Sequence, residues 1–73
     1  ERYVVGRIKP PKAVIGERVR DVNFLKKFDV TLAAVKLEFT DSFSHPDPET
    51  VLSYGTELLV CGSPQAIEAL AEE

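Results

Sequence analysis

The alternation of apolar and polar residues predicts two strands in the first half of the chain. Residues 3–9 alternate loosely and stop at Pro10-Pro11, which is typical of an edge strand because proline cannot donate to a ladder. Residues 30–39 are apolar on both sides at first and then alternate strictly, so we expect a central strand covered on both faces at its beginning. One face of its second half carries Val35, Leu37 and Phe39.

Further strands are predicted toward the end of the chain. Leu58–Cys61 is a short apolar run between two glycines, which favours a buried strand over a helix. We expect residues 57–62 to join the sheet together with residues 50–52. Between them, Tyr54-Gly55 predicts a turn in which the glycine supplies a positive φ angle. The single cysteine, Cys61, is expected to pack in the core.

Two helical segments complete the predicted elements. In residues 17–28 apolar side chains recur every three positions, as on one face of a helix, and Asn23 is expected to divide this segment into two short turns. The second helix begins at Pro64, with Ser63 as its N-cap. The apolar stripe of the first segment consists of Val19, Val22, Leu25 and Phe28. The second helix carries Ile67, Leu70 and Ala71 on one side, and we expect Ile67 and Leu70 to dock on the sheet.

These elements predict an α+β domain, in which a small, mostly antiparallel or mixed sheet is covered by two or three short helices. We expect residues 1–73 to form one domain, because a chain of this length suffices for a single core. A domain of this size buries only about 60% of its unfolded surface, so support from a partner surface is common. The sequence begins at Glu1 and contains no methionine, and we expect it to be a piece of a longer chain.

Charge and composition exclude several functions. The net charge of −3, from 9 basic and 12 acidic residues, argues against DNA or RNA as a partner, since such sites need clustered Lys and Arg. No apolar run approaches the roughly 18–20 residues of a membrane span. A lone cysteine suits a reduced cytosol, so we expect a cytoplasmic domain.

Catalysis and metal binding are not expected. Asp47 and Glu49 are the nearest to an acid–base pair, but no nucleophile or further carboxylate is placed to cooperate with them. His45 is the only histidine, and no second His or Cys stands at ligand spacing, so we expect no metal and no resident cofactor.

Several short motifs follow one another in an order that resembles a known family. Ile15-Gly16 precedes the first amphipathic segment, and Lys26-Lys27-Phe28-Asp29-Val30-Thr31 leads into the strong strand. The loop His45-Pro46-Asp47-Pro48 and the run Leu58–Pro64 follow. In this order, over nearly the whole of residues 3–71, the chain is similar to the C-terminal domain of regulators of potassium conductance, the TrkA-C domain.

The resemblance implies a domain that forms a homodimer and belongs to the cytosolic part of a potassium channel or transporter subunit, or of a cation–proton antiporter. It implies a regulatory role, in which a small nucleotide binds at the dimer interface and biases a gate. In some bacterial members this ligand is cyclic di-AMP, which makes it the candidate ligand here. The alternative that the sequence leaves open is a structural dimerisation module with no ligand of its own.

The same resemblance implies the residues of a binding site. Two departures from the pattern stand out: members that bind cyclic di-AMP frequently have Arg at the place of Leu25, and the family often has Gly at the place of Asp29. We expect apolar and proline surface to hold the bases, and His45 and Thr31 to offer polar contacts. The candidate ligand-binding residues are Val19, Asn23, Leu25, Thr31, Leu32, Ala33, His45, Pro46 and Pro48.

A basic cluster and the one histidine each allow two interpretations. Arg18, Arg20, Lys26 and Lys27 form the densest group of cations, which is either a solvated helix face or, in a dimer, a doubled positive charge for a dianionic ligand. His45 is either an exposed loop residue or a ring that stacks on or hydrogen-bonds an adenine, with its neighbouring prolines as a stiff wall.

Overall fold

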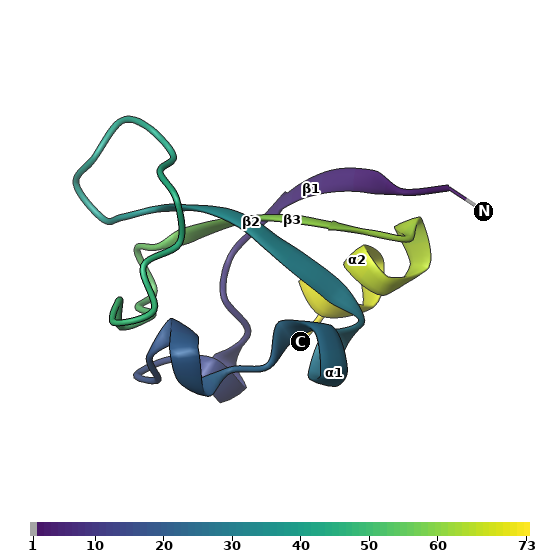
Figure 1. Ribbon diagram of the computed structural model, residues 1–73, viewed down its shortest axis with the longest axis horizontal. Helices are drawn as coiled ribbons and strands as arrows, with labels where there is room; N and C mark the ends of the chain where they lie inside the picture. Colours follow the sequence, from purple (N-terminus) through teal and green to yellow (C-terminus); the bar gives the residue numbers. More distant parts are fainter. Residues whose placement is uncertain (1) are drawn as a thin grey trace.

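The computed structural model describes residues 2–73, which form short strands and short helices (Figure 1). The sheet lies above and the helices below it in this view. The elements are strand β1 (Val4–Ile8), 3₁₀ helices η1 (Lys12–Val14) and η2 (Val19–Asp21), helix α1 (Phe24–Phe28), strands β2 (Val30–Lys36) and β3 (Glu57–Gly62), and helix α2 (Pro64–Ala71). The predicted α+β fold is confirmed.

Within residues 2–73, β1, β2 and β3 form one antiparallel sheet in the order β1-β3-β2. The edge strand predicted at residues 3–9 is confirmed. The central position predicted for residues 30–39 is wrong, because β3 takes that place and pairs with both neighbours. The strand also ends at Lys36, since the chain turns away at Phe39, whose φ angle is 69° and whose side chain is 97% exposed.

Residues 50–52 do not belong to the sheet, contrary to the prediction. Val51 forms an isolated bridge with Arg18, and Leu52 exchanges backbone hydrogen bonds with Gly16 (2.8 Å) and Glu17 (2.9 Å). The fully buried side chain of Leu52 anchors this segment in the core. The segment therefore pairs with residues 16–18, which lie between the two 3₁₀ helices, and does not join the sheet of β1, β2 and β3.

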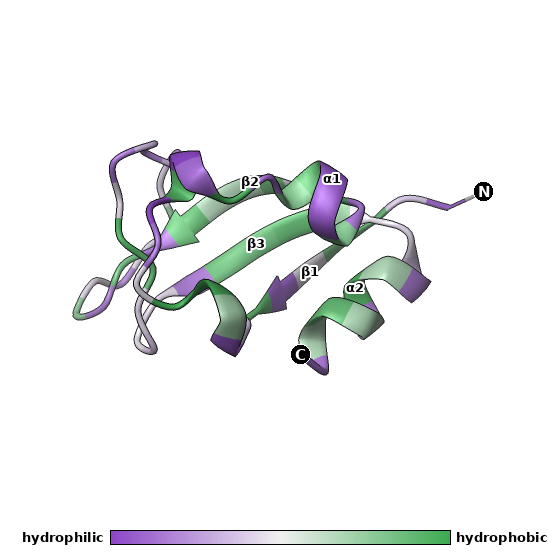
Figure 2. Ribbon diagram, turned by 90° about the horizontal axis from the view of Figure 1, so that it is seen from below, coloured by the Kyte–Doolittle hydropathy of each residue, from purple (hydrophilic) through white to green (hydrophobic). Residues whose placement is uncertain are grey.

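The core lies between one face of the sheet and the helices. Figure 2, seen from below, shows α1 and α2 on that face of the sheet. β3 alternates between buried and half-buried residues along its length, so every second side chain points into this layer. Cys61 is one of the half-buried residues on the opposite face, which corrects its expected place in the core. The buried apolar residues are Ile8, Val14, Val22, Phe24, Val30, Val35, Leu52, Leu58, Val60 and Leu70.

The first helical segment is divided at Asn23, as predicted. The Asn23 side chain accepts a hydrogen bond from the Lys26 amide at 3.1 Å and begins α1 as its N-cap. This new start resets the phase of the helix, so Phe24 is buried and Leu25 is 60% exposed. The stripe of apolar residues predicted at a spacing of three is therefore wrong at Leu25. Asp29 ends α1 in the left-handed conformation, at a φ angle of 60°.

Helix α2 begins as predicted, with Ser63 as its N-cap and Pro64 in its first turn. The Ser63 hydroxyl accepts from the Ala66 amide at 3.1 Å, and Leu70 is almost completely buried.

The glycine with a positive φ angle is Gly16 (91°) and not Gly55 as expected. A Cβ on Gly55 would meet only the end of the Glu38 side chain, which is exposed and can move aside. No helix within residues 2–73 has the length and apolar character needed to cross a membrane.

Candidate functional site

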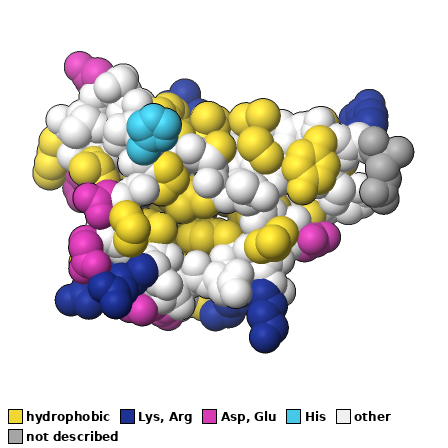
Figure 3. All heavy atoms as spheres, viewed as in Figure 1, with side chains coloured by type: hydrophobic (Ala, Val, Ile, Leu, Met, Phe, Trp, Pro, Cys, Tyr) yellow, Lys and Arg dark blue, Asp and Glu magenta, His cyan; other side chains and the backbone are white. Residues whose placement is uncertain are grey.

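A groove of about 440 Å³ opens between η2, α1, the beginning of β2 and the proline-containing loop. Figure 3 looks onto this face, where hydrophobic side chains gather around a hollow at the centre. Its walls are mostly apolar, and the polar side chains among its lining residues come from η2, the N-cap of α1 and β2. The lining residues are Val19, Arg20, Val22, Asn23, Phe24, Leu25, Val30, Thr31, Leu32 and Pro46.

Six of the nine residues predicted for the site line this groove. They come from segments that are separate in the sequence and lie together on one face of the fold. The spacing of the motifs along the chain does not by itself bring these segments together. The six are Val19, Asn23, Leu25, Thr31, Leu32 and Pro46.

The other three predicted residues lie outside the lining of the groove. Ala33 is exposed at an irregularity of β2, where the pairing with β3 shifts register. Pro48 is exposed, and its carbonyl accepts a hydrogen bond from the Arg20 amide at 3.0 Å. His45 is exposed beside Pro46, and Figure 3 shows the histidine ring on the same face as the hollow. A ligand larger than the groove would reach it there.

Four lining residues were absent from the predicted site. Val22, Phe24 and Val30 are buried core residues whose side chains also form the floor of the groove. Their apolar character signals a core position in the sequence and gives no sign of a second role. Arg20 belongs to the basic cluster noted in the sequence. Its positive charge was the signal that could have identified it as a residue of the binding site.

Backbone hydrogen bonds hold the proline-containing loop against η2. The Val19 amide donates to Thr50 O at 2.9 Å, next to the Arg20–Pro48 bond described above. A salt bridge of 2.6 Å joins Arg20 Nη1 to Glu49 Oε2, and Arg18 Nε lies 3.7 Å from the other oxygen of the same carboxylate. Hydrogen bonds and salt bridges therefore join the loop to η2 at the rim of the groove, next to the guanidinium group of Arg20.

The outer edge of β2 runs along this groove. β2 pairs with β3 on one side, and on the other side Val35 forms a two-bond bridge with Ser44, at 2.9 Å in each direction. Within the part of the chain that the structure describes, residues 30–34 have no strand partner on that outer side. The exposed Leu25 lies on α1, next to the beginning of this edge. An unpaired edge of this kind can accept a strand from another molecule.

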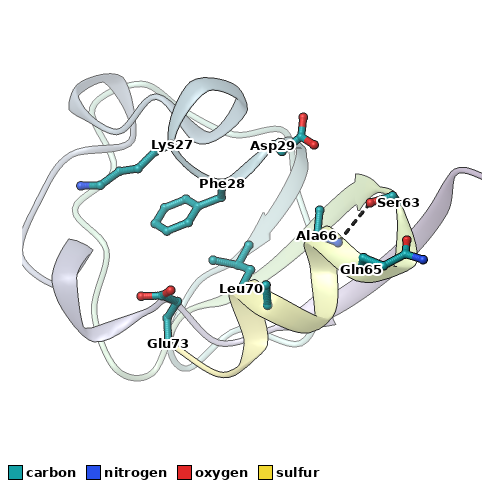
Figure 4. A pocket seen from close by; sticks show the side chains of 9 residues that line it. Lys27, Phe28, Asp29, Ser63, Gln65, Ala66, Leu70 and Glu73 are labelled. Carbon is teal, nitrogen blue, oxygen red and sulfur yellow. Dashed lines mark hydrogen bonds between the residues drawn. The ribbon is translucent and has the colours of Figure 1, made fainter.

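A second groove, of about 400 Å³, lies between α1 and α2 (Figure 4). Phe28 and Leu70 point toward each other across it, and the Ser63 hydroxyl is occupied by the Ala66 amide. None of the residues predicted for the site lines it. We interpret it as the seam where two short helices pack, and we place the candidate site in the first groove.

The first groove can hold a flat apolar group and an anion at the same time. Val19, Leu32 and Pro46 offer apolar surface, Thr31 a hydroxyl group and Arg20 a guanidinium group. Among residues 2–73, no three His, Cys, Asp or Glu side chains are grouped so as to hold a metal ion. This combination of apolar wall and cation suits a nucleotide better than a purely apolar ligand.

Comparison with solved structures defines the class of the fold. The RCK domain of GsuK matches with a TM-score of 0.76 at 19% identity, covering 99% of this chain and 16% of that one. The GsuK channel bound to NAD matches with a TM-score of 0.76 at 20% identity, over 96% of this chain and 13% of that one. The RCK C domain of the potassium transport protein KtrA, in complex with cyclic di-AMP, matches with a TM-score of 0.78 at 17% identity, over 97% of this chain and 82% of that one. This chain thus has the fold of an RCK C-terminal domain and spans a small part of the GsuK chains.

The family follows from the sequence match. The model of the TrkA-C domain matches residues 6–73, which is nearly the whole chain. The chain belongs to the TrkA-C domain family, and the resemblance seen in its motifs is confirmed. No curated protein matches the chain.

Proposed function

We propose that this chain is the regulatory ligand-binding domain of a potassium or other monovalent cation transport system, and that it senses a nucleotide such as cyclic di-AMP at a dimer interface. The observation that carries the proposal is the groove beside the outer edge of β2, which is lined by six of the residues that the family resemblance implies. Membership of the TrkA-C family supports the regulatory role. On this proposal the domain is cytoplasmic, is part of a longer chain and performs no catalysis.

The nucleotide is inferred from the chemistry of the groove together with two structural neighbours. The KtrA domain, 82% of which the match covers, is described in complex with cyclic di-AMP, and the GsuK channel is described as bound to NAD. Both ligands contain adenine and phosphate. The apolar walls and the guanidinium group of the groove suit these two components.

A second copy of the chain would complete the site. β2 presents an outer edge without a strand partner over residues 30–34, and Leu25 and Thr31 are exposed beside it. Pairing two such edges about a twofold axis would satisfy backbone groups and cover Leu25. It would also place two grooves on either side of one axis, and a ligand with two bases and two phosphates shares that symmetry.

Each residue has a defined task in the proposed complex. The bases lie against Val19, Leu32 and Pro46, with Pro48 as a rigid neighbour and His45 closing over them from the loop. Thr31 and Asn23 offer polar contacts. Ala33, at the irregularity of β2, shapes the strand edge where the two copies meet. Leu25 contributes apolar contact and cannot hold a phosphate.

The proposed mechanism is a shift of population. A ligand that contacts both copies favours the arrangement of the dimer in which both grooves face it, and the gate follows that arrangement. The free energy available to the gate equals the difference in binding free energy between the two arrangements.

Isothermal titration calorimetry of the chain with cyclic di-AMP, cyclic di-GMP, AMP and NAD tests the proposal, combined with sedimentation at micromolar concentration. We expect a dimer, and one cyclic di-AMP per two chains. A domain that dimerises and gives no heat with any of the four nucleotides would be a structural dimerisation module. A purely monomeric species of 8.1 kDa, with or without ligand, would contradict both interpretations.

A further inference from the structure

At the rim of the groove, two arginines share one carboxylate. Arg20 Nη1 lies 2.6 Å from one oxygen of Glu49, and Arg18 Nε lies 3.7 Å from the other. No other carboxylate among the described residues pairs with either guanidinium group. The cluster thus contains two guanidinium groups and one carboxylate, with the Asp47 carboxylate beside it, and Figure 3 shows basic and acidic side chains gathered at one side of this face.

Arg20 is the member of the cluster that lines the groove. It is the one charged residue among the described residues that line the groove, and Arg18 and Glu49 lie outside the lining. Its backbone is held in place by the bond from its amide to Pro48 O at 3.0 Å. Its side chain is 55% exposed and can therefore turn between Glu49 and the groove.

Glu49 is positioned by its own loop. Its amide donates to Asp47 Oδ1 at 2.9 Å, so the turn after Pro46 points its carboxylate at the two arginines. The side chain of Glu49 is 60% exposed. An ion pair between two exposed side chains changes an equilibrium by less than about fivefold, so another anion can displace it at little cost.

We infer that Arg20 is the phosphate anchor of this domain, and that Glu49 is an internal anion which the ligand phosphate displaces from it. The inference rests on the proposed function and supplies the cation that Leu25 cannot provide. A guanidinium group binds phosphate through two parallel hydrogen bonds, which are stronger than a single-point contact with a mobile carboxylate. In the dimer, two copies of Arg20, one from each chain, would face the two phosphate groups of a cyclic dinucleotide.

The exchange has a consequence for affinity. Because Glu49 competes with the ligand for Arg20, it weakens binding, and its removal should tighten it. Arg18 remains next to Glu49 when Arg20 turns away, so the displaced carboxylate keeps a partner. The pair Arg20–Glu49 thus sets the concentration at which the domain responds.

A double-mutant cycle with cyclic di-AMP as the probe tests this inference. Calorimetry on Arg20→Gln, Glu49→Gln and the combination should show binding about tenfold weaker for the first, because one charge-assisted phosphate contact is lost. Glu49→Gln should bind up to about fivefold more tightly. In the Arg20→Gln background, Glu49→Gln should change nothing. Lys12→Gln and Glu68→Gln are the matched controls, since both residues are exposed and outside the groove.

Three outcomes are distinguishable. If the wild-type chain binds and Arg20→Gln matches Lys12→Gln, the inference is wrong while the proposed function stands. If Glu49→Gln tightens binding equally with and without Arg20, Glu49 acts by general repulsion and the displacement is refuted. If neither the wild type nor any variant binds, the proposed function itself fails and the inference with it.

NMR of the Arg20 Nε–Hε group in the wild-type chain tests the anchor without any variant that could misfold. The signal of this group should shift when cyclic di-AMP is titrated. A signal that stays in place while the ligand binds contradicts the role of Arg20 as the phosphate anchor.

Discussion

Gly6 of β1 packs directly against Ile67 of α2. A Cβ built on Gly6 would be 2.6 Å from Ile67 Cγ2, a distance that real side chains do not reach. The absence of a side chain at this one position of β1 allows α2 to dock on the strand. The contact joins residues near the two ends of the chain and closes the core on that side.

Gly6→Ala is therefore expected to lower the free energy of unfolding by about 1–3 kcal/mol, since the added methyl group overpacks the contact. Urea denaturation measures the change. The double variant Gly6→Ala, Ile67→Ala should lose less than the sum of the two single variants, because the smaller residue makes room. Additive losses would show that α2 does not pack on Gly6.

Leu70→Ala should lower the free energy of unfolding by about 2–5 kcal/mol, because Leu70 is 2% exposed and its truncation leaves a cavity under the sheet. The matched control is Leu37→Ala, since Leu37 follows directly after β2 and is 41% exposed. It should cost less than about 1 kcal/mol. Equal losses in urea denaturation would mean that α2 is not docked as described.

Glu57 should make the stability of the domain depend on pH in the acid range. A hydrogen bond from Arg7 Nε at 2.6 Å lowers the pKa of Glu57 below its ordinary value of 4.5, against an opposing effect of partial desolvation. A carboxyl group whose pKa is lowered by folding stabilises the folded state above its unfolded pKa, and this stabilisation disappears as the pH falls through the folded pKa.

The expected result is a shallower loss of stability below pH 4.5 in Glu57→Gln than in the wild type. Thermal unfolding followed by circular dichroism at a series of pH values measures it. Glu68→Gln, on the exposed side of α2, serves as the control and should keep the wild-type slope. Identical slopes for all three proteins would show that the Arg7–Glu57 bond is not formed in solution.

Asp29→Gly should raise the free energy of unfolding by about 0.5–1 kcal/mol. Asp29 has a φ angle of 60°, which strains a residue with a Cβ and suits glycine. Asp29→Ala should lower stability, because alanine meets the same strain without the local hydrogen bonds available to Asp. Both changes can be read as shifts of the thermal midpoint, and a loss in Asp29→Gly would show that the Asp29 side chain makes a stabilising contact.

Two further variants test the walls of the proposed site. Val19→Asp should abolish nucleotide binding by placing an unpaired charge against the bases, while His45→Ala should weaken it about tenfold, or about 1.4 kcal/mol. Calorimetry with cyclic di-AMP measures both. Tyr54→Ala is the control, because Tyr54 is an exposed aromatic residue that does not line the groove. A His45→Ala variant that binds like this control would remove His45 from the site.

Local patterns were enough to find the elements whose signals are contained in a few consecutive residues. Ser63-Pro64 marks the start of α2 because the cap and the fixed φ angle act within one turn. Asn23 likewise divides the helical segment through a bond to an amide three residues away. The order of such motifs was also sufficient to find the family, since it needs no knowledge of which residues meet in space.

The tertiary structure alone decided which strand is central and which residues surround the groove. Strand order depends on pairing between residues far apart in the chain, and β3 became central because both β1 and β2 pair with it. Leu25 became exposed because the cap at Asn23 turned the helix and Phe24 took the place in the core. Arg20 and Glu49 are 29 positions apart, so their contact exists only after the proline-containing loop folds back on η2. Periodicity reports which way a side chain points along its own element, whereas burial and contact depend on what the rest of the chain places opposite it.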